Sequence, residues 1–396
     1  MSDLPFVTVA MPCLDEAHYI EDCLRCVQQQ DYPRDRFEIF VADGGSTDGT
    51  LDILARLADR DGRIRVIANP GRIQAAGMNE VLRVSRGEVV VRLDVHGEYA
   101  QDYLRKCVEV LERTGADNAG GAQRPKFKGR FQQALCAALA SPLGVGGSPY
   151  RSANNEGFVD TVFNGAFRRS VFDRAGLYDP RAITNEDAEL NQRILQSGGR
   201  VYLSREIVAW YYPRDSLQGL ARQYFNYGRG RARTLLKHRK LPTHRPLVPF
   251  VTLILGVILL ATAGWHPFSL PAFLAYSLLC VAEAVRVGRA AVWWSVPLIA
   301  FLFPVMHVAH GLGMGVGLLR YARHPDWTQP ESVPLSAALQ WLPSDRFLKL
   351  APPPVRRLLG QRREQRKRRR GDGSWDLGGE GRDCVQCRPG VRRCSR

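Results

Sequence analysis

Short apolar runs alternate with amphipathic segments along the first 115 residues. Runs rich in β-branched residues predict strands, whereas apolar positions spaced by three and four residues predict helices. The expected strands cover 6–11, 37–42, 64–68 and 88–93, and the expected helices cover 17–30, 50–60, 73–85 and 102–113. Such alternation predicts right-handed crossovers and therefore an α/β domain, Rossmann-like, with a mostly parallel sheet.

The alternation weakens after residue 115. Residues 143–157 are dense in Gly, Ser and Asn and show no apolar periodicity, which predicts a loop. Two readings stay open for this loop: a lid on the acceptor side of a binding site, or a plain linker. Further strands are expected at 158–167 and 201–212, and a helix is expected at 188–196.

Three nearly charge-free apolar runs follow at 247–265, 268–285 and 290–319. About 20 apolar residues are needed to cross a bilayer, so we expect at least two spans. Basic residues flank the first two runs, which predicts that these flanks lie on the cytoplasmic side. The third run contains Pro304, and it stays open whether this run re-enters, lies along the interface or makes two short crossings. Its GxxxG from Gly313 to Gly317 favours close helix packing.

The charge of the chain is concentrated at its end. The formal net charge is +16, and residues 356–396 carry 14 Lys and Arg against 5 Asp and Glu. Charge segregated beside apolar spans favours anionic lipid headgroups over nucleic acid, so we expect a membrane and no nucleic acid as partner. We divide the chain into a catalytic domain at 1–235, a membrane region at 246–320 with two to four hydrophobic segments, a juxtamembrane segment at 321–355 and a disordered basic tail at 356–396.

Acidic residues follow three of the predicted strands, at 15–16, 43–48 and 94. Ligands of parallel sheets gather outside the carboxyl ends of the strands, so these three loops should share one edge. Taken singly, each cluster also suits a helix cap or a turn. Carboxylates crowded together repel one another unless a cation binds between them, so the three clusters together predict a metal.

Four motifs in order resemble the signatures of family 2 glycosyltransferases: PCLDE at 12–16, DGGSTDGT at 43–50, NPGRIQAAGMN at 69–79 and RLDVHG at 92–97. The resemblance implies a GT-A fold and an inverting enzyme that uses a nucleotide sugar. It further implies that a divalent metal, Mn²⁺ or Mg²⁺, bridges the diphosphate. The implied nucleotide-sugar residues are Pro12, Glu16, Asp43 and Asp94, and the implied metal ligands are Asp94 and His96. His96 stands where the family usually carries a second Asp, and either direct ligation or a water-mediated role stays open for it.

Glu186 and Asp187 precede the helix expected at 188–196, where acidic residues also suit the helix macrodipole. The same resemblance implies that Asp187 is the general base, with Glu186 beside it in the catalytic pair. Residues 222–229 look like a variant of the family's QxxRW region. Arg229 is the candidate there for contact with the donor diphosphate, together with Gln223 and Tyr227, although contact with lipid phosphates is equally consistent.

Three later segments, VDTVFNGAFRR, EDAELNQR and QYFNYGRGRAR, are similar to bacterial exopolysaccharide glucosyltransferases of the succinoglycan type. This similarity implies a multi-pass enzyme of the inner (plasma) membrane with a cytoplasmic catalytic domain. Its expected partners are a nucleotide-sugar donor, UDP-glucose, and a polyprenyl-diphosphate-linked saccharide acceptor. A processive polysaccharide synthase and a non-catalytic membrane scaffold are the alternatives.

Overall fold

The computed structural model describes residues 4–240, 243–265, 267–291 and 293–327. The predicted basic tail at 356–396 and most of the juxtamembrane segment at 321–355 lie outside these residues. The sequence predicted eight of the first ten elements at close to their observed positions. They are β1 Val7–Cys13, α1 Ile20–Gln28, β2 Phe37–Asp43, α2 Thr50–Arg60, β3 Ile64–Ala68, α3 Gln74–Val84, β4 Val89–Arg92 and, after the short β5, α4 Tyr103–Thr114.

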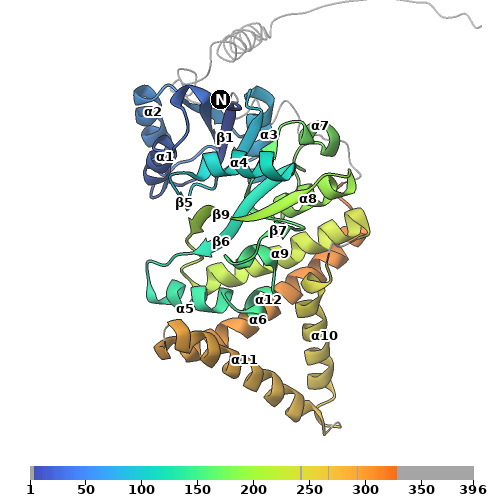
Figure 1. Ribbon diagram of the computed structural model, residues 1–396. Helices are drawn as coiled ribbons and strands as arrows, with labels where there is room; N and C mark the ends of the chain where they lie inside the picture. The colour runs from blue at the N-terminus through green and yellow to red at the C-terminus, as the bar shows by residue number, and fades with distance from the viewer. Residues whose placement is uncertain (1–3, 241–242, 266, 292, 328–396) are drawn as a thin grey trace, which may run out of the picture. The chain divides into compact units, whose positions relative to one another are not determined.

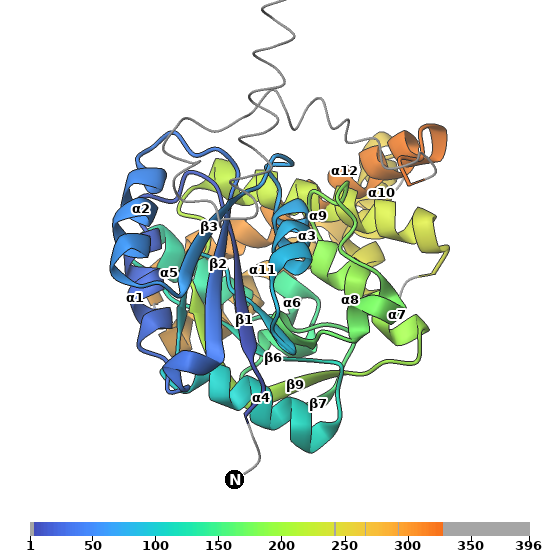
Figure 2. The same ribbon diagram turned by 90° about the horizontal axis from the view of Figure 1, so that it is seen from above.

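The first four strands form the parallel half of the sheet, in the order β3-β2-β1-β4. Side chains alternate between its two faces. Val7, Val9 and Met11 pack into one apolar core, whereas Ala10 packs into another with Phe40 from β2. Figure 2 shows α1 and α2 on one side of these strands and α3 on the other. Both faces are therefore covered, as parallel strands require.

The other half of the sheet is mixed, which corrects the prediction of a mostly parallel sheet. Its strands are β8 Phe163–Arg168, β6 Asn118–Pro125, β9 Val201–Tyr211 and β5 Gly97–Tyr99, with β7 Gly157–Phe158 beside β9. β8 runs antiparallel to both β4 and β6, whereas β6 and β9 are parallel. The expected strand at 158–167 is thus two separate strands, β7 and β8.

Strand β6 had no apolar signature because its sequence, NAGGAQRP, is poor in β-branched residues. A Cβ atom at Gly121 would lie 1.9 Å from the carbonyl oxygen of Ile207 in β9. Close approach of two backbones therefore selects glycine there, and the strand is stabilised by its neighbours rather than by its own propensity.

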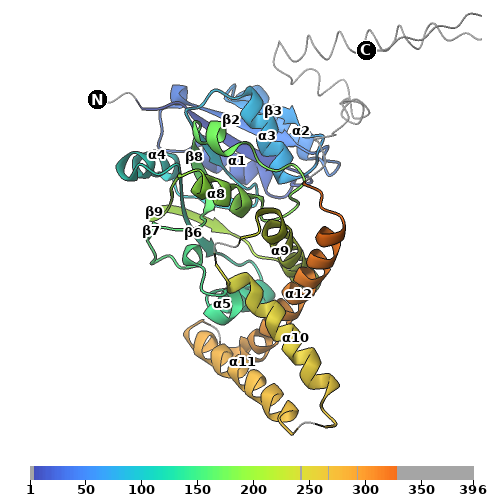
Figure 3. The ribbon, with the colours of Figure 1, turned by 90° about the vertical axis from the view of Figure 1, so that its right-hand side faces the viewer.

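The remaining helices include α5 Arg130–Leu139, α6 Pro142–Val145, α7 Val171–Ala175, α8 Glu186–Gln196 and α9 Leu217–His238. The apolar runs form α10 Val248–Ala261, α11 Ser269–Ala291 and α12 Val296–Arg323. Figures 1 and 3 show α10 and α11 leading away from the sheet and back, and α12 returning beside α9.

Two of these helices, α11 and α12, are long and apolar enough to cross a membrane by length and composition. The run at 247–265 was expected to be a full span, but its helix α10 ends at Ala261 after 14 residues. At about 1.5 Å per residue it falls short of a hydrocarbon core about 30 Å thick. In contrast, α12 continues through Pro304 for 28 residues.

Many apolar side chains of α10 and α11 face outward. Leu260, Leu270 and Leu278 each expose more than three-fifths of their surface, and no residue of α10 is buried. A core helix of a soluble protein would bury such side chains. An apolar environment outside the protein would remove the cost of exposing them to water.

Helix α12 packs closely against α9 through glycines. A Cβ at Gly313 would lie 1.9 Å from the carbonyl oxygen of Phe225, and one at Gly228 would lie 2.0 Å from that of His310. The predicted packing role of the GxxxG is therefore confirmed. The partner of Gly313 and Gly317 is α9 rather than another apolar helix.

We expect Gly313→Ala to lower the unfolding free energy by about 1–3 kcal/mol, because the added methyl meets the α9 backbone. Gly256→Ala is the matched control, since a Cβ there has nothing within 4 Å, and it should be neutral or slightly stabilising. Thermal unfolding of both variants in detergent checks the difference. Equal melting temperatures would contradict the α9–α12 packing.

Candidate active site

The loops after β1 and β2 are joined by hydrogen bonds at the carboxyl edge of the sheet. The amide of Asp15 donates to Ser46 Oγ at 2.8 Å, and the Asp15 carboxylate accepts from the amide of Thr47 at 2.8 Å. The amide of Glu16 donates to Thr50 Oγ1 at 2.9 Å. The expectation that the acidic loops share one edge is confirmed for these two, and the β4 loop reaches the same place through His96.

Asp43 lies beneath this edge instead of in the cavity above it. Its Oδ1 accepts from the amides of Gly45 and Ser46 at 2.8 and 2.9 Å, and its Oδ2 accepts from Ser46 Oγ at 2.6 Å. The residue is 1% exposed and is not among the cavity-lining residues. In this structure the Asp43 carboxylate stabilises the loop that follows β2 by binding Gly45 and Ser46. The predicted contact with the nucleotide stays a prediction.

Asp94 is held in place by a buried tyrosine. The Tyr99 hydroxyl accepts from the amide of Asp94 and donates to its carbonyl, both at 2.8 Å, while Asn164 Nδ2 donates to the same hydroxyl at 3.0 Å. The turn between β4 and β5 is thereby fixed. Pro12, Glu16, Asp94 and His96 all line the cavity, and their predicted contacts with a nucleotide sugar or a metal stay predictions.

Arg92, the last residue of β4, links this edge to α8. The side chain is 6% exposed. Its Nε contacts Asp94 Oδ1 at 3.2 Å, and its Nη1 donates to Glu186 Oε1 at 2.8 Å. Nη2 donates to Gln74 Oε1 at 3.1 Å. One buried guanidinium therefore orients a predicted metal ligand and the first residue of α8 at once.

Glu186 is buried and forms an ion pair with Arg92. It is 4% exposed. Burial and the neighbouring Asp187 carboxylate raise the pKa of Glu186, and the charge of Arg92 opposes that rise. The ionised form of the buried glutamate is therefore favoured by its pairing with Arg92.

His96 Nδ1 lies 3.5 Å from Glu16 Oε1. Burial lowers the pKa of His96, but the contact with Glu16 and the charges of Asp94 and Glu16 outweigh burial and raise it. Among the described residues, no group of three or more acidic, His or Cys side chains is placed to hold a metal ion. The donor atoms of Asp94 and His96 suit an ion that takes its remaining ligands from phosphate and water, and ligation by these two residues stays a prediction.

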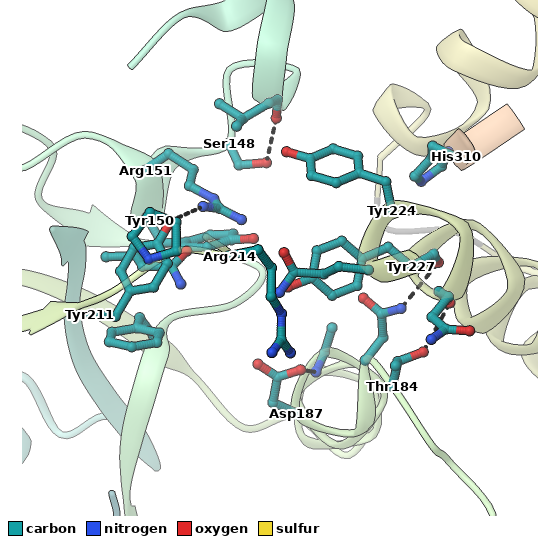
Figure 4. A pocket seen from close by; sticks show the side chains of 18 of the residues that line it. Ser148, Tyr150, Arg151, Thr184, Asp187, Tyr211, Arg214, Tyr224, Tyr227 and His310 are labelled. Carbon is teal, nitrogen blue, oxygen red and sulfur yellow. Dashed lines mark hydrogen bonds between the residues drawn. The ribbon is translucent and has the colours of Figure 1, made fainter. Parts of the chain in front are cut away.

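Asp187 is the second residue of α8 and faces the same cavity (Figure 4). The preceding Asn185 has a left-handed backbone with φ 59°, and its Nδ2 donates to the carbonyl of Tyr227 at 3.2 Å. Thr184 Oγ1 donates to the carbonyl of Asn226 at 3.0 Å. The segment that presents Asp187 is thus docked on α9, where a Cβ at Gly230 would come within 2.6 Å of both Thr184 and Asn185.

Buried charges behind α8 strengthen this docking. Asp179 Oδ2 accepts from Arg233 at 2.9 Å and from Lys237 at 2.6 Å. Lys237 also donates to Glu189 of α8 at 2.8 Å, and Arg233 pairs with Asp326, just beyond α12. Burial alone would raise the pKa of Asp179, but the hydrogen bond from Lys237 and the charge of Arg233 lower it to about 2.

The cavity has a volume of about 990 Å³. It joins the sheet edge and α8 to residues of the apolar helices, including Thr252, Tyr276, Leu279 and Met306. Residues of the predicted loop at 143–157 line it as well. These are Leu143, Gly144, Val145, Gly146, Ser148, Tyr150 and Arg151. A lid role for this loop stays a prediction.

Arg229 is not among the cavity-lining residues, although it was the predicted diphosphate contact. A Cβ at Gly317 would lie 3.0 Å from the Cα of Arg229, so this residue sits on the face of α9 that packs against α12. Gln223, Tyr227 and Arg231 are on the cavity side instead. A helix turns by about 100° per residue, which separates Arg229 from Arg231 around α9.

Two arginines important to the site were missed by sequence reasoning. Arg92 carried a usable signal, because a charged residue inside a strand of valines requires a buried partner. Arg214 lines the cavity after β9, and its charge acts on His96, which places it on the same side of the cavity as His96. Nothing in the local sequence distinguishes Arg214 from a surface arginine.

Comparison with known proteins bears on this site. The model for "Glycosyl transferase family 2" matches residues 8–176. The succinoglycan biosynthesis protein ExoA of Rhizobium meliloti (strain 1021) is 36% identical over 318 residues, which cover 80% of this chain and 96% of that protein. A protein of Methanococcus voltae is 26% identical over 326 residues, which cover 80% of this chain and 98% of that protein. Its name is dolichyl N-acetyl-alpha-D-glucosaminyl phosphate 3-beta-D-2,3-diacetamido-2,3-dideoxy-beta-D-glucuronosyltransferase.

Among solved structures, a mannosyltransferase of Pyrobaculum calidifontis in complex with GDP-Man and Mn²⁺ matches with a TM-score of 0.58 at 20% identity. The match covers 80% of this chain and 88% of that one. A likeness at this identity establishes the fold alone. It confirms a GT-A-like α/β domain, here with a mixed sheet.

The ion pairs behind α8 predict a loss of stability in acid. The folded-state pKa of Asp179 is about 2 against an ordinary 3.8, so its contribution is present above about pH 4 and is lost as pH falls toward 2. Asp179→Asn should cost about 2 kcal/mol at pH 7 and almost nothing near pH 2. Asp59→Asn, on the exposed side of α2, should show no such pH dependence. Melting temperatures across this range check both, and a constant gap for Asp179→Asn would contradict the network.

Proposed function

Because the chain belongs to glycosyltransferase family 2, as its motifs predicted, we propose that it moves a hexose from a nucleotide sugar, UDP-glucose, to a saccharide carried on a polyprenyl diphosphate. The setting is exopolysaccharide or cell-envelope glycan synthesis. One observation carries this proposal: a single cavity is lined by Glu16, Asp94 and His96 on one wall and by Asp187 on another.

The donor occupies the sheet-edge side of the cavity. Pro12, Glu16 and Asp94 face the nucleotide sugar, and Arg214 supplies positive charge near the diphosphate. Asp94 and His96 would hold a divalent metal, Mn²⁺ or Mg²⁺, which when bound offsets the negative charge of the nucleoside diphosphate. Support for a metal comes from this donor pair and from the Mn²⁺ named with the Pyrobaculum mannosyltransferase.

Asp187 is the general base. Its carboxylate accepts the proton of the acceptor hydroxyl while that oxygen bonds to the anomeric carbon and the nucleoside diphosphate departs with the electrons of the broken bond. Attack from the side opposite the leaving group inverts the anomeric centre. Glu186, paired with Arg92, positions the start of α8 and does not take the proton.

The acceptor enters from the apolar helices. The cavity includes Thr252 of α10, Leu279 of α11 and Met306 of α12, so a substrate seated there can leave a hydrocarbon chain among these helices. The dolichyl substrate in the name of the Methanococcus relative supports a lipid-linked acceptor.

The membrane part of the proposal keeps the divisions at 1–235 and 246–320, joined through α9. We assign α10 and α11, which lead away from the sheet and back, to the inner (plasma) membrane, with α12 packed on α9 and the catalytic domain on the cytoplasmic side. Outward-facing leucines on α10 and α11 and the basic residues that precede α10 support this arrangement.

Transfer by purified protein is the first test. UDP- and GDP-sugars are offered with Mn²⁺ or Mg²⁺ and a membrane lipid extract, and nucleotide release and labelled lipid product are measured. UDP-glucose should give a lipid-extractable labelled product that depends on the cation. No release with any donor would overturn the proposal, and a long insoluble product would indicate a polysaccharide synthase.

Asp187→Asn tests the assignment of the base. Loss of the proton acceptor should lower kcat by about 10²–10⁴-fold while UDP affinity stays unchanged. Asp173→Asn, an exposed acid of α7, is the control and should leave both quantities unaltered. Transfer retained by Asp187→Asn at the wild-type rate would remove Asp187 from this role.

A further inference from the structure

Three arginines line the part of the cavity nearest the apolar helices: Arg151, Arg231 and Arg245. None of them forms an ion pair with a carboxylate of the described residues. Their situation differs from that of Arg92 and Arg233, each of which binds two carboxylates. Positive charges that border a cavity without protein counter-ions favour an anionic ligand.

Arg151 is surrounded by aromatic residues that carry hydroxyl groups. Its Nη1 donates to the Tyr211 hydroxyl at 3.1 Å, and its guanidinium lies 5.3 Å from the centre of the Tyr150 ring. Tyr224 and Tyr227 of α9 line the same space (Figure 4). A guanidinium flanked by hydroxyl groups, which can turn to donate to a ligand, matches the oxygen-rich surface of a phosphate.

The other two arginines come from separate elements and meet nearby. Arg231 lies one turn after Tyr227 on α9, and Arg245 begins the 3₁₀ turn Arg245–Leu247 that leads into α10. Both line a small adjoining cavity together with Ser148, Tyr150 and Asp160. Arg245 Nη1 donates to the carbonyl of Gly147 at 3.4 Å. Asp160 is the acidic residue of this cavity, and it pairs with neither arginine.

The position of these charges matches the order of groups in the proposed acceptor. Asn185, two residues before Asp187, contacts the carbonyl of Tyr227, so the base and this part of α9 are adjacent. Arg231 follows by one turn, and Arg245 leads directly into the apolar α10. Moving outward from the base, the cavity thus offers a site for sugar, then positive charge, then an apolar surface.

We propose that Arg151, Arg231 and Arg245 form a subsite for the diphosphate of the lipid-linked acceptor, separate from the donor diphosphate near Arg214. The identity of the acceptor rests on the proposed function, whereas the diphosphate–hydrocarbon chemistry of the subsite rests on the arginines, the tyrosines and the apolar helices. A lipid headgroup phosphate or a free phosphate could supply part of the same chemistry, and the test separates these sources.

Direct binding tests the subsite without requiring transfer. The full chain in detergent is first saturated with UDP and Mn²⁺, which fill the donor side of the cavity. It is then titrated with farnesyl diphosphate. Farnesol, inorganic pyrophosphate and a dispersed anionic phospholipid are titrated separately as comparison probes. Farnesyl diphosphate should bind at least tenfold more tightly than each of the other three. Arg151→Gln and Arg231→Gln should each weaken it at least tenfold, and Arg151→Lys should retain part of the affinity.

Arg222→Gln is the matched control, because Arg222 is an exposed residue of α9 that does not line the cavity. It should bind farnesyl diphosphate like the wild type, and all variants should keep the wild-type melting temperature and UDP affinity. Displacement of farnesyl diphosphate by UDP would assign the arginines to the donor, and equal binding of farnesol or of the phospholipid would also overturn the subsite. If the subsite holds but no donor is turned over, the proposed function fails while this inference stands.

Discussion

The site depends on one buried guanidinium. Arg92 at the end of β4 contacts Asp94, which lines the cavity at the sheet edge, and the buried Glu186 of α8. Two carboxylates that face one site repel each other, and a cation between them favours their ionised forms. Arg92 therefore keeps the edge and the helix at a fixed separation. A glycosyl transfer that uses Asp94 for the donor and Asp187 for the acceptor requires that separation to be constant.

A second set of contacts relates the catalytic helix to the apolar helices. Helix α9 receives Thr184 and Asn185 on one face, through Gly230, and packs its other face on α12, through Gly228 and Gly313. The ion pairs of Asp179 and Glu189 with Lys237 fix α8 along the same helix. The position of α12 therefore influences the position of Asp187. This arrangement explains why the reaction cavity opens toward apolar residues of α10, α11 and α12.

Much of the fold could be predicted because local pattern and tertiary environment agree in the parallel half. The strands from β1 to β4 are β-branched and buried, and their acidic loops fall at one edge by topology alone. The family resemblance was confirmed, as was the packing role of Gly313. The mixed half escaped prediction because β6 is stabilised by close backbone approach at Gly121 and not by its own side chains. The length of α10 was overestimated, because hydropathy gives no signal for the helix end at Ala261.

Residue roles were harder to predict than elements. The sequence placed Glu16, Asp94, His96 and Asp187 at one cavity, but it could not show that Asp43 would turn its carboxylate into its own loop. Arg229 and Arg231 lie on different faces of α9, and the packing of one of these faces on α12 decides which arginine lines the cavity. Arg151 and Arg245 come from irregular segments far apart in the chain, so their proximity depends on the whole fold.

A double-mutant cycle on Arg92 and Glu186 tests the central claim most directly. Arg92→Met alone should lower the unfolding free energy by about 3–5 kcal/mol, because it leaves the buried Glu186 carboxylate unpaired. Adding Glu186→Gln should restore at least about 1 kcal/mol of that loss. The control is the same double-mutant cycle on the exposed ion pair of Arg56 and Glu21, whose coupling energy should be less than about 0.5 kcal/mol. Additive effects of Arg92→Met and Glu186→Gln would contradict the account, since the guanidinium would then not connect the sheet edge to α8.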